Sequence, residues 1–383
     1  KTYLPDSDID VSAFFSRSHE VTWTSRVLNA LCVDAHATSL AIKSVKSVTF
    51  VNAEVKIVKA NINGINVDIS GNQGGALAVL GLFEEVDRLV GRNHLFKRTL
   101  LLCRTWFQHE AGLMGTQNGL MSTFCLRTII LFIFNAFHTR IRTPLDGLYL
   151  LLTYLEHFQW NDHALSLFGP VRLASLPQLD YVMDGPCSYP GGQQLIPPAL
   201  LQKYSTVNLT SGSSDVPAVF QPKFVNVIDP TNTVNNLGKS VHYKSVSFIQ
   251  NTIVDGARRW RQVIAQLAAD PAADTKAIIY RMFEKTFQAY PEINRRLEAQ
   301  QYAAGLTSEP LSARSVSSNT GGGAGGLSMP ALITASTSPA RAGSGSPAMG
   351  LTATGPVFDP LDGNLARIVD NLHHAREFEP PGK

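Results

Sequence analysis

Three aspartates near the start of the chain have the residue type and spacing that metal-dependent chemistry needs. Asp8 and Asp10 stand two apart in an alternating segment, and residues i and i+2 of a β-strand point to one face. Asp68 lies in a second alternating segment, residues 65–70. Converging carboxylates repel one another, and hard divalent cations relieve that repulsion. The pattern predicts two ions, Mg²⁺ or Mn²⁺, the arrangement used for in-line nucleotidyl transfer.

Two other interpretations of the acidic segment compete with this one. A calcium-binding helix–loop–helix motif needs Gly at its sixth position and Glu at its twelfth, where this chain has Val11 and Arg17, so it is excluded. A solvated acidic turn is the plainer alternative. Asp68 counts against that turn, because a lone Asp within an alternating strand is disfavoured by strand propensity.

The elements that would position these carboxylates are strands. Residues 45–62 are rich in β-branched side chains and predict a strand, and Asn63-Gly64 is a strong signal for a hairpin turn into the return strand 65–70. Residues 1–75 as a whole alternate strand and short-helix patterns. We therefore expect a small mixed sheet that carries the metal site.

The middle of the chain, residues 76–304, is predicted to be mostly helical. Residues 169–222 are rich in Pro, Gly and Ser, which predicts long surface loops. Gly91 is expected to cap the end of the first helix. Apolar periodicity predicts helices over residues 76–90, 94–109, 118–138, 145–158, 246–269 and 273–301. The expected fold class is therefore α+β, with a small sheet domain packed on a helical domain.

The last region, residues 305–383, has low sequence complexity. Ser, Gly, Ala, Thr and Pro dominate up to residue 355, and such a composition buries too little apolar surface to offset its chain entropy. We expect a mostly disordered tail. Residues 363–376 either form a short amphipathic helix, which would be a docking element for a protein partner, or fray.

Composition narrows the class of protein further. The four cysteines have no Cys-x-x-Cys spacing, which predicts core thiols in a reducing, intracellular compartment; nuclear and cytoplasmic locations are not distinguished. The most apolar run, residues 128–137, is about half of the ~20 residues that a membrane span needs, so we expect no membrane association. A net charge of +3 neither identifies nor excludes a polyanionic partner.

Four sequence blocks carry a family resemblance. They occur in order and span residues 1 to about 300: residues 4–11, 67–73, 118–124 and 227–241. Together they resemble the DNA polymerase β-like nucleotidyltransferase superfamily. More narrowly, they are similar to the poly(A) polymerase and terminal uridylyltransferase branch with a PAP-associated domain. Residues 1–5 and 83–89 resemble most the plant and green-lineage type of this branch.

The resemblance implies a template-independent RNA nucleotidyltransferase. Residues 1–75 would be its catalytic core and residues 76–304 a helical domain like the PAP/OAS1 substrate-binding domain. Asp8, Asp10 and Asp68 match the metal-binding carboxylates of the two-metal mechanism, with a nucleoside triphosphate and an RNA 3′ end as substrates. The family's Gly-Ser element, which grips the triphosphate, is expected upstream of Lys1.

The resemblance also implies a nucleotide site. Ser122 and Thr123 match two serines that reach the triphosphate near a helix N-terminus, and Phe124 stands where a Tyr stacks on the base. Arg104 replaces the helical lysine that meets the phosphates. Asn235 stands where uridylyltransferases commonly have His, which favours ATP over UTP. Residues that contact the RNA are not assigned.

Departures from the family pattern keep an alternative open. Arg104 reaches differently from lysine, Gln108 stands where some relatives have a second basic residue, and Gly71 replaces the usual Phe. These changes favour a catalytically degenerate member that binds RNA or protein through the same fold. A third hypothesis keeps the chemistry but changes the acceptor to a small molecule or protein.

Overall fold

The computed structural model describes residues 4–34, 44–52, 55–176, 194–205, 219–270 and 274–291. Described residues up to Thr286 belong to one compact unit, and a second unit begins at Phe287. The predicted tail, including the 363–376 helix, lies outside the described residues.

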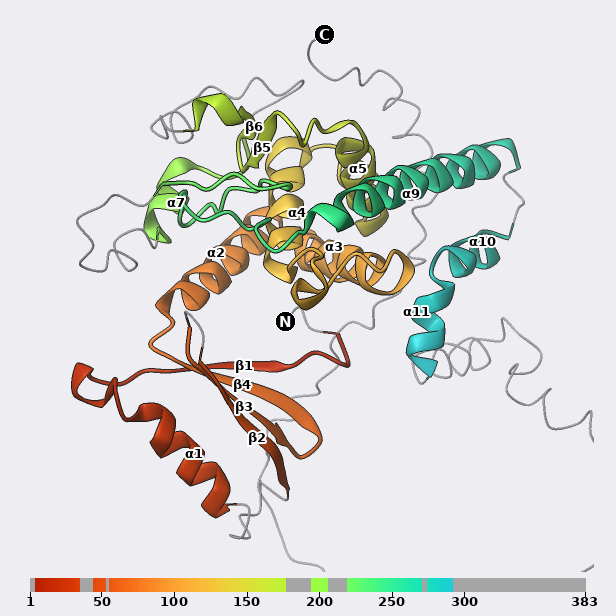
Figure 1. Cartoon of the computed structure of the whole chain (residues 1–383). Coiled ribbons are helices and arrows are strands. Elements are labelled where there is room, and N and C mark those ends of the chain that lie inside the picture. The colour runs from red at the N-terminus through yellow and green to blue at the C-terminus, as the bar shows by residue number, and fades with distance from the viewer. Residues whose placement is uncertain are drawn as a thin grey trace, which may run out of the picture. The chain divides into compact units, whose positions relative to one another are not determined.

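A four-stranded mixed sheet forms the first part of the chain. Its order is β1-β4-β3-β2, with β1 parallel to β4 and the other neighbours antiparallel (Figure 1). The strands are β1 (Ile9–Ala13), β2 (Val45–Val51), β3 (Ile57–Ile62) and β4 (Ile65–Gly71). The prediction of a single strand over residues 45–62 is wrong, because the chain reverses between Val51 and Ile57 to pair β2 with β3.

The hairpin between β3 and β4 forms as predicted. Asn63 and Gly64 have φ angles of 54° and 84°, the left-handed backbone that a tight two-residue turn requires. A helix, α1 (Trp23–Asp34), covers one face of the sheet, where Trp23 and Leu31 bury Val58 and Ala60. The other face is left for polar side chains.

The rest of the described chain is mostly helical, as expected for the α+β class. Its helices are α2 (Gly74–Val90), α3 (Leu95–Thr105), the π-helix η2 (Trp106–Glu110), α4 (Thr123–Phe137), α5 (Pro144–His157), α7 (Pro198–Lys203), α9 (Tyr243–Ala269), α10 (Thr275–Met282) and α11 (Glu284–Ala289). Short 3-10 turns occur at Arg17–His19, Thr116–Asn118 and Leu173–Ser175. Helix α4 is buried along most of its length, and α9 packs along α5 (Figure 1).

Several predicted boundaries change for local reasons. The helix predicted from residue 118 begins at Thr123, because Ser122 accepts a hydrogen bond from the backbone N–H of Cys125 and caps α4. Gly91 ends α2 with φ 61°, as predicted. The single helix predicted over residues 273–301 is interrupted at Phe283, and its part beyond residue 291 lies outside the described residues.

The loop prediction for residues 169–222 is partly wrong. A hairpin of β5 (His163–Ser166) and β6 (Gly169–Arg172) enters this region, and Pro198 starts the short helix α7. Residues 177–193 and 206–218 lie outside the described residues.

Two further sequence expectations concern thiols and membranes. Cys103 and Cys125 are buried as expected, and burial raises the pKa of Cys125 to about 12. Cys32 is exposed, contrary to the prediction of a core thiol. Over the stretches that the structure describes, no helix combines the length and apolarity needed to cross a bilayer.

Candidate functional site

The sheet brings the predicted aspartates to one face. Asp8 directly precedes β1, and Asp10 on β1 is in register with Asp68 on β4 across the parallel ladder. In-register residues of neighbouring strands point to the same side of a sheet, so Asp10 and Asp68 share the face opposite α1. The two carboxylates therefore lie side by side.

The electrostatics of Asp10 reflect this crowding. Its pKa is raised, first because surrounding protein atoms withdraw the carboxylate from water, and then because Asp68 and Asp8 repel its negative charge. Lys59 and Arg127 oppose the rise. The ionised form of Asp10 would be stabilised by an additional cation beside it.

Lys59 supplies the nearest positive charge. It is the cross-strand partner of Asp68 in the antiparallel β3–β4 pair, and its ammonium group forms an ion pair with the Asp68 carboxylate. The Lys59 side chain is 42% exposed, so it can swing into solvent at little cost.

Metal binding fits the chemistry of these donors but not their present positions. Carboxylate oxygens are the ligands that Mg²⁺ and Mn²⁺ prefer. Within the described parts of the chain, no three Asp, Glu, His or Cys side chains converge closely enough to hold an ion as they stand. An ion shared by Asp10 and Asp68 would compete with the Lys59 ammonium group for the Asp68 carboxylate.

Two arginines of the helical region are neighbours, and one of them, Arg127, acts on Asp10. Arg104 lies in the last turn of α3, and Arg127 lies four residues after the first residue of α4. Burial and repulsion by Arg104 lower the pKa of Arg127, whereas attraction by Asp10 raises it. Two mutually repelling guanidinium groups near a carboxylate site would be stabilised by a polyanion such as a triphosphate.

Sequence reasoning missed Arg127. The residue borders the most apolar run of the chain and looked like the polar end of a buried helix. Its i, i+4 spacing from Thr123, which places both on one face of α4, was the available signal. Gln108 is also near the site, since its side-chain amide donates to Asp6 Oδ2 at 3.3 Å.

The residues at the start of α4 have mixed surroundings. The Ser122 hydroxyl caps the helix through the Cys125 N–H at 3.0 Å, and Thr123 is the first helical residue. The Phe124 ring packs edge-on against Phe83 of α2, with centroids 6.5 Å apart. Phe124 is half-buried, so only part of its surface is open.

Asn235 belongs to a loop organised by a buried carboxylate. Its side-chain amide donates to Asp229 Oδ2 at 3.0 Å, and Lys239 Nζ donates to its carbonyl oxygen at 3.3 Å. Asp229 is only 4% exposed, and its Oδ1 accepts from the N–H and hydroxyl of Thr231. The Asn235 side chain is thus held at both ends.

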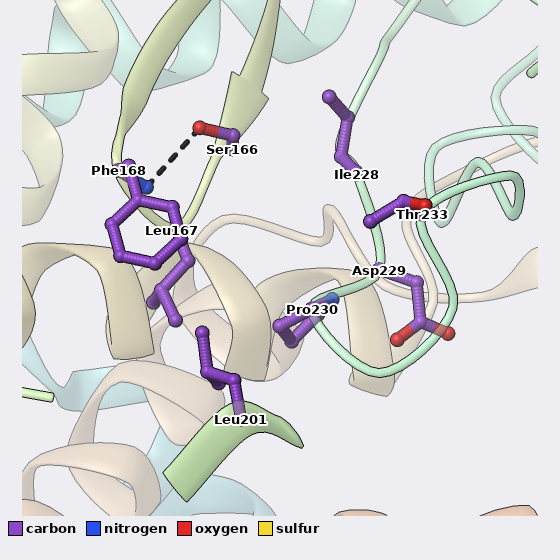
Figure 2. Close-up of a pocket in the computed structure, with 8 residues that line it drawn as sticks. All are labelled: Ser166, Leu167, Phe168, Leu201, Ile228, Asp229, Pro230 and Thr233. Carbon is purple, nitrogen blue, oxygen red and sulfur yellow. Dashed lines mark hydrogen bonds between the residues drawn. The ribbon is translucent and has the colours of Figure 1, made fainter. Parts of the chain in front are cut away.

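A pocket lies beside the same loop (Figure 2). Its space, including the part open to solvent, is about 230 Å³. Figure 2 shows that the hairpin residues Ser166 to Phe168, Leu201 of α7 and the turn from Ile228 to Thr233 form its walls. The Phe168 N–H donates to the Ser166 hydroxyl at 3.1 Å and fixes the hairpin wall. None of the predicted site residues lines this pocket.

Comparison with known protein families gives a match over the helical region. The PAP/OAS1 substrate-binding domain family matches residues 90–287. The chain belongs to this family, which confirms the resemblance to the poly(A) polymerase and uridylyltransferase branch. The search of curated proteins found no match.

Solved structures are similar at low sequence identity. The Cid1 poly(U) polymerase bound to MgGTP is 11% identical, with a TM-score of 0.45 over 68% of this chain and 78% of that one. The polymerase core of TRAMP, an RNA surveillance complex, is 18% identical, with a TM-score of 0.43 over 72% of this chain and 74% of that one.

Proposed function

We propose that the chain is a template-independent RNA nucleotidyltransferase that extends an RNA 3′-hydroxyl. The observation that carries the proposal is the in-register pair Asp10 and Asp68 on one face of the sheet, with Arg127 acting electrostatically on Asp10. Family membership supplies the helical domain that such enzymes use to hold substrate. Residues 1–75 would carry the chemistry and residues 76–304 the nucleotide.

Each group would have a distinct task. Asp8, Asp10 and Asp68 would hold divalent cations, which when bound supply activation of the attacking hydroxyl and neutralisation of the triphosphate charge. Arg104 and Arg127 would orient the phosphates through charge-assisted hydrogen bonds. The backbone amides and the Ser122 and Thr123 hydroxyl groups at the start of α4 would bind the triphosphate. The open side of the Phe124 ring would stack on the base.

The test is extension of a labelled RNA primer by the full-length protein with Mg²⁺ or Mn²⁺. Asp68→Ala should abolish extension while the far-ultraviolet circular dichroism spectrum and the unfolding temperature change little. The matched control is Asp255→Ala, which removes an exposed carboxylate from an ion pair with Arg258 on α9 and should leave extension intact. Equal extension by wild type and Asp68→Ala would refute the assignment.

The ion pair between Lys59 and Asp68 favours one competing function, a non-catalytic binding module. A lysine that holds a metal ligand competes with the metal for it. If the protein is an enzyme, Lys59→Gln should lower the concentration of Mg²⁺ needed for half-maximal extension. A binding module would retain RNA affinity and show no incorporation with either cation in wild type or Lys59→Gln.

A finer proposal concerns the base of the incoming nucleotide. We infer that the protein prefers ATP to UTP as its substrate. Asn235 presents an amide donor and a carbonyl acceptor in a fixed orientation between Asp229 and Lys239. A His there would add bulk and, when protonated, donate from both ring nitrogens, which suits the carbonyl-rich edge of uracil.

One hydrogen bond plus the steric difference corresponds to a preference of about 5- to 150-fold. Asn235→His should move the ratio of ATP to UTP incorporation toward UTP in a competition assay. Preferred use of UTP by the wild type would refute the base assignment, and an unchanged ratio in the variant would remove Asn235 from it.

A further inference from the structure

Two aromatic rings from distant parts of the chain meet on the surface. Phe224 precedes the buried 225–230 segment, and Tyr243 is the first residue of α9. Their centroids lie 5.5 Å apart with the ring planes tilted by 56°. Phe224 is 47% exposed and Tyr243 is 74% exposed, so both residues leave a substantial surface open to solvent. We name this pair the Phe224–Tyr243 platform.

The surroundings of the platform are basic. Lys223 and Lys244 adjoin the two rings in sequence, and both are exposed, as is His242. The first turn of α9 contains no acidic residue. Among the described residues, neither Lys223 nor Lys244 forms an ion pair with a carboxylate. The platform thus joins aromatic faces to unneutralised positive charge.

The platform is attached to the candidate nucleotide site. The backbone N–H of His242 donates to the Gly119 carbonyl at 3.0 Å, and the Ser240 hydroxyl donates to the Leu120 carbonyl at 2.8 Å. The contact is close, because a Cβ added at Gly119 would lie 2.5 Å from the His242 ring. Residues 119–120 lead directly into Ser122, the cap of α4.

We propose that the Phe224–Tyr243 platform binds single-stranded RNA, with bases stacked on the exposed rings and phosphates near Lys223 and Lys244. Aromatic rings between cations are the arrangement that grips single strands without reading sequence, since every base has a π-face. The charge favours a polyanion over an apolar protein surface. The inference rests on the proposed function in that it locates the RNA which that reaction would extend.

The experiment is fluorescence anisotropy of full-length protein with labelled oligo(A) and oligo(U) about 15 nucleotides long, without nucleoside triphosphate or divalent metal. Tyr243→Ala and Phe224→Ala should each weaken binding about 5- to 100-fold. Tyr243→Phe keeps the ring and should stay within about twofold of wild type. Phe224→Leu keeps apolar area but not the ring, and should behave like Phe224→Ala.

Salt dependence tests the lysines separately. If Lys223 and Lys244 contact phosphates, each Lys→Gln change should reduce the slope of log affinity against log salt by about 0.7, the value for single strands. The matched control is Lys285→Gln. Lys285 lies in α11 and its ammonium group donates to the Glu110 carbonyl, so this substitution should leave the slope unchanged.

Several outcomes would overturn the inference. Failure of the wild type to bind either oligonucleotide would do so, as would unchanged affinity in both Ala variants. Oligonucleotide affinity retained by Phe224→Leu but lost in Phe224→Ala would show that apolar area rather than ring stacking carries the contact, and would overturn the stacking platform. Because no triphosphate or metal is present, these results are independent of extension: a wild type that binds through the platform yet never extends RNA would refute only the proposed function.

Discussion

Asp10 in the sheet and Asp229 in the helical region have opposite surroundings. Asp10 lies on an exposed face among two other carboxylates, and its pKa is raised by partial desolvation and by repulsion from Asp68 and Asp8. Asp229 is buried and accepts hydrogen bonds from the Thr231 N–H, the Thr231 hydroxyl, the Asn232 N–H and the Asn235 amide.

The difference separates a carboxylate that organises its loop from one whose charge its neighbours do not balance. A buried carboxylate surrounded by donors is stable only because every donor is present, and it fixes the loop that contributes them. A carboxylate that lies among other carboxylates does not stabilise the folded state. Such an arrangement is common at sites where a cation or substrate supplies the missing charge.

The largest expected effect on folding is at Asp229. Asp229→Ala would leave the donors of Thr231, Asn232 and Asn235 without their acceptor in a buried loop. We expect the free energy of unfolding to fall by about 2–4 kcal/mol, measured by urea denaturation.

Two variants sharpen this prediction. Asp229→Asn keeps one acceptor oxygen but places a second amide donor against the amide of Asn235. The stability of this variant should therefore lie between those of wild type and Asp229→Ala. Asp68→Ala should change stability by less than about 1 kcal/mol, because its ion pair with the half-exposed Lys59 is weak in water. Equal losses at Asp229 and Asp68 would break the distinction between the two regions.

The second expected effect is on nucleotide binding, at Arg127. If Arg127 serves a ligand, Arg127→Gln should raise the dissociation constant for ATP about 10-fold, the loss of one charge-assisted hydrogen bond. Stability should change little, because the change removes repulsion from Arg104 together with attraction to Asp10. Isothermal titration calorimetry with the exposed Arg140→Gln as control measures the first quantity. A large loss of stability with unchanged ATP affinity would make Arg127 a structural residue.

Sequence patterns indicate the placement of residues in the sheet better than in the helical region, and the reason is physical. Alternation along a strand states which residues share a face, so the spacing alone groups Asp8 with Asp10. The parallel register that sets Asp10 opposite Asp68 is a tertiary property. Lys59 as the partner of Asp68 depends on the register of β3 against β4 in the same way.

Contacts in the helical region cannot be predicted from local sequence, because they join segments that are far apart in the chain. The spacing of Arg127 from Thr123 places it on one face of α4, but its approach to Arg104 follows only from the packing of distant segments. Nothing in the local sequence of the Asp229-Pro230 segment shows that the Asp229 carboxylate is buried. The β5–β6 hairpin was missed because its turn, Leu167-Phe168, has no turn-forming residue, and Gly169 follows it with φ 125°.

The smallest expected effect concerns the pH dependence of Asp10. Its raised pKa means that the folded protein binds this proton more tightly than the unfolded chain does. The ionised group therefore costs stability at neutral pH, and that cost disappears as pH falls through the folded-state pKa toward the ordinary value of an aspartate. Asp10→Asn should accordingly be more stable than wild type at neutral pH, with a difference that vanishes in acid.

The magnitude should be below about 1 kcal/mol, because Asp10 is exposed and solvent screens its interactions. That corresponds to a rise of about 1–3 °C in Tm, measurable by differential scanning calorimetry across the pH range. Adding Mg²⁺ should raise the Tm of the wild type and have less effect on Asp10→Asn, since an ion bound between Asp10 and Asp68 removes the same repulsion. Equal Mg²⁺ responses would place any bound ion elsewhere, and a destabilised Asp10→Asn at neutral pH would show that Asp10 supports the fold as Asp229 does.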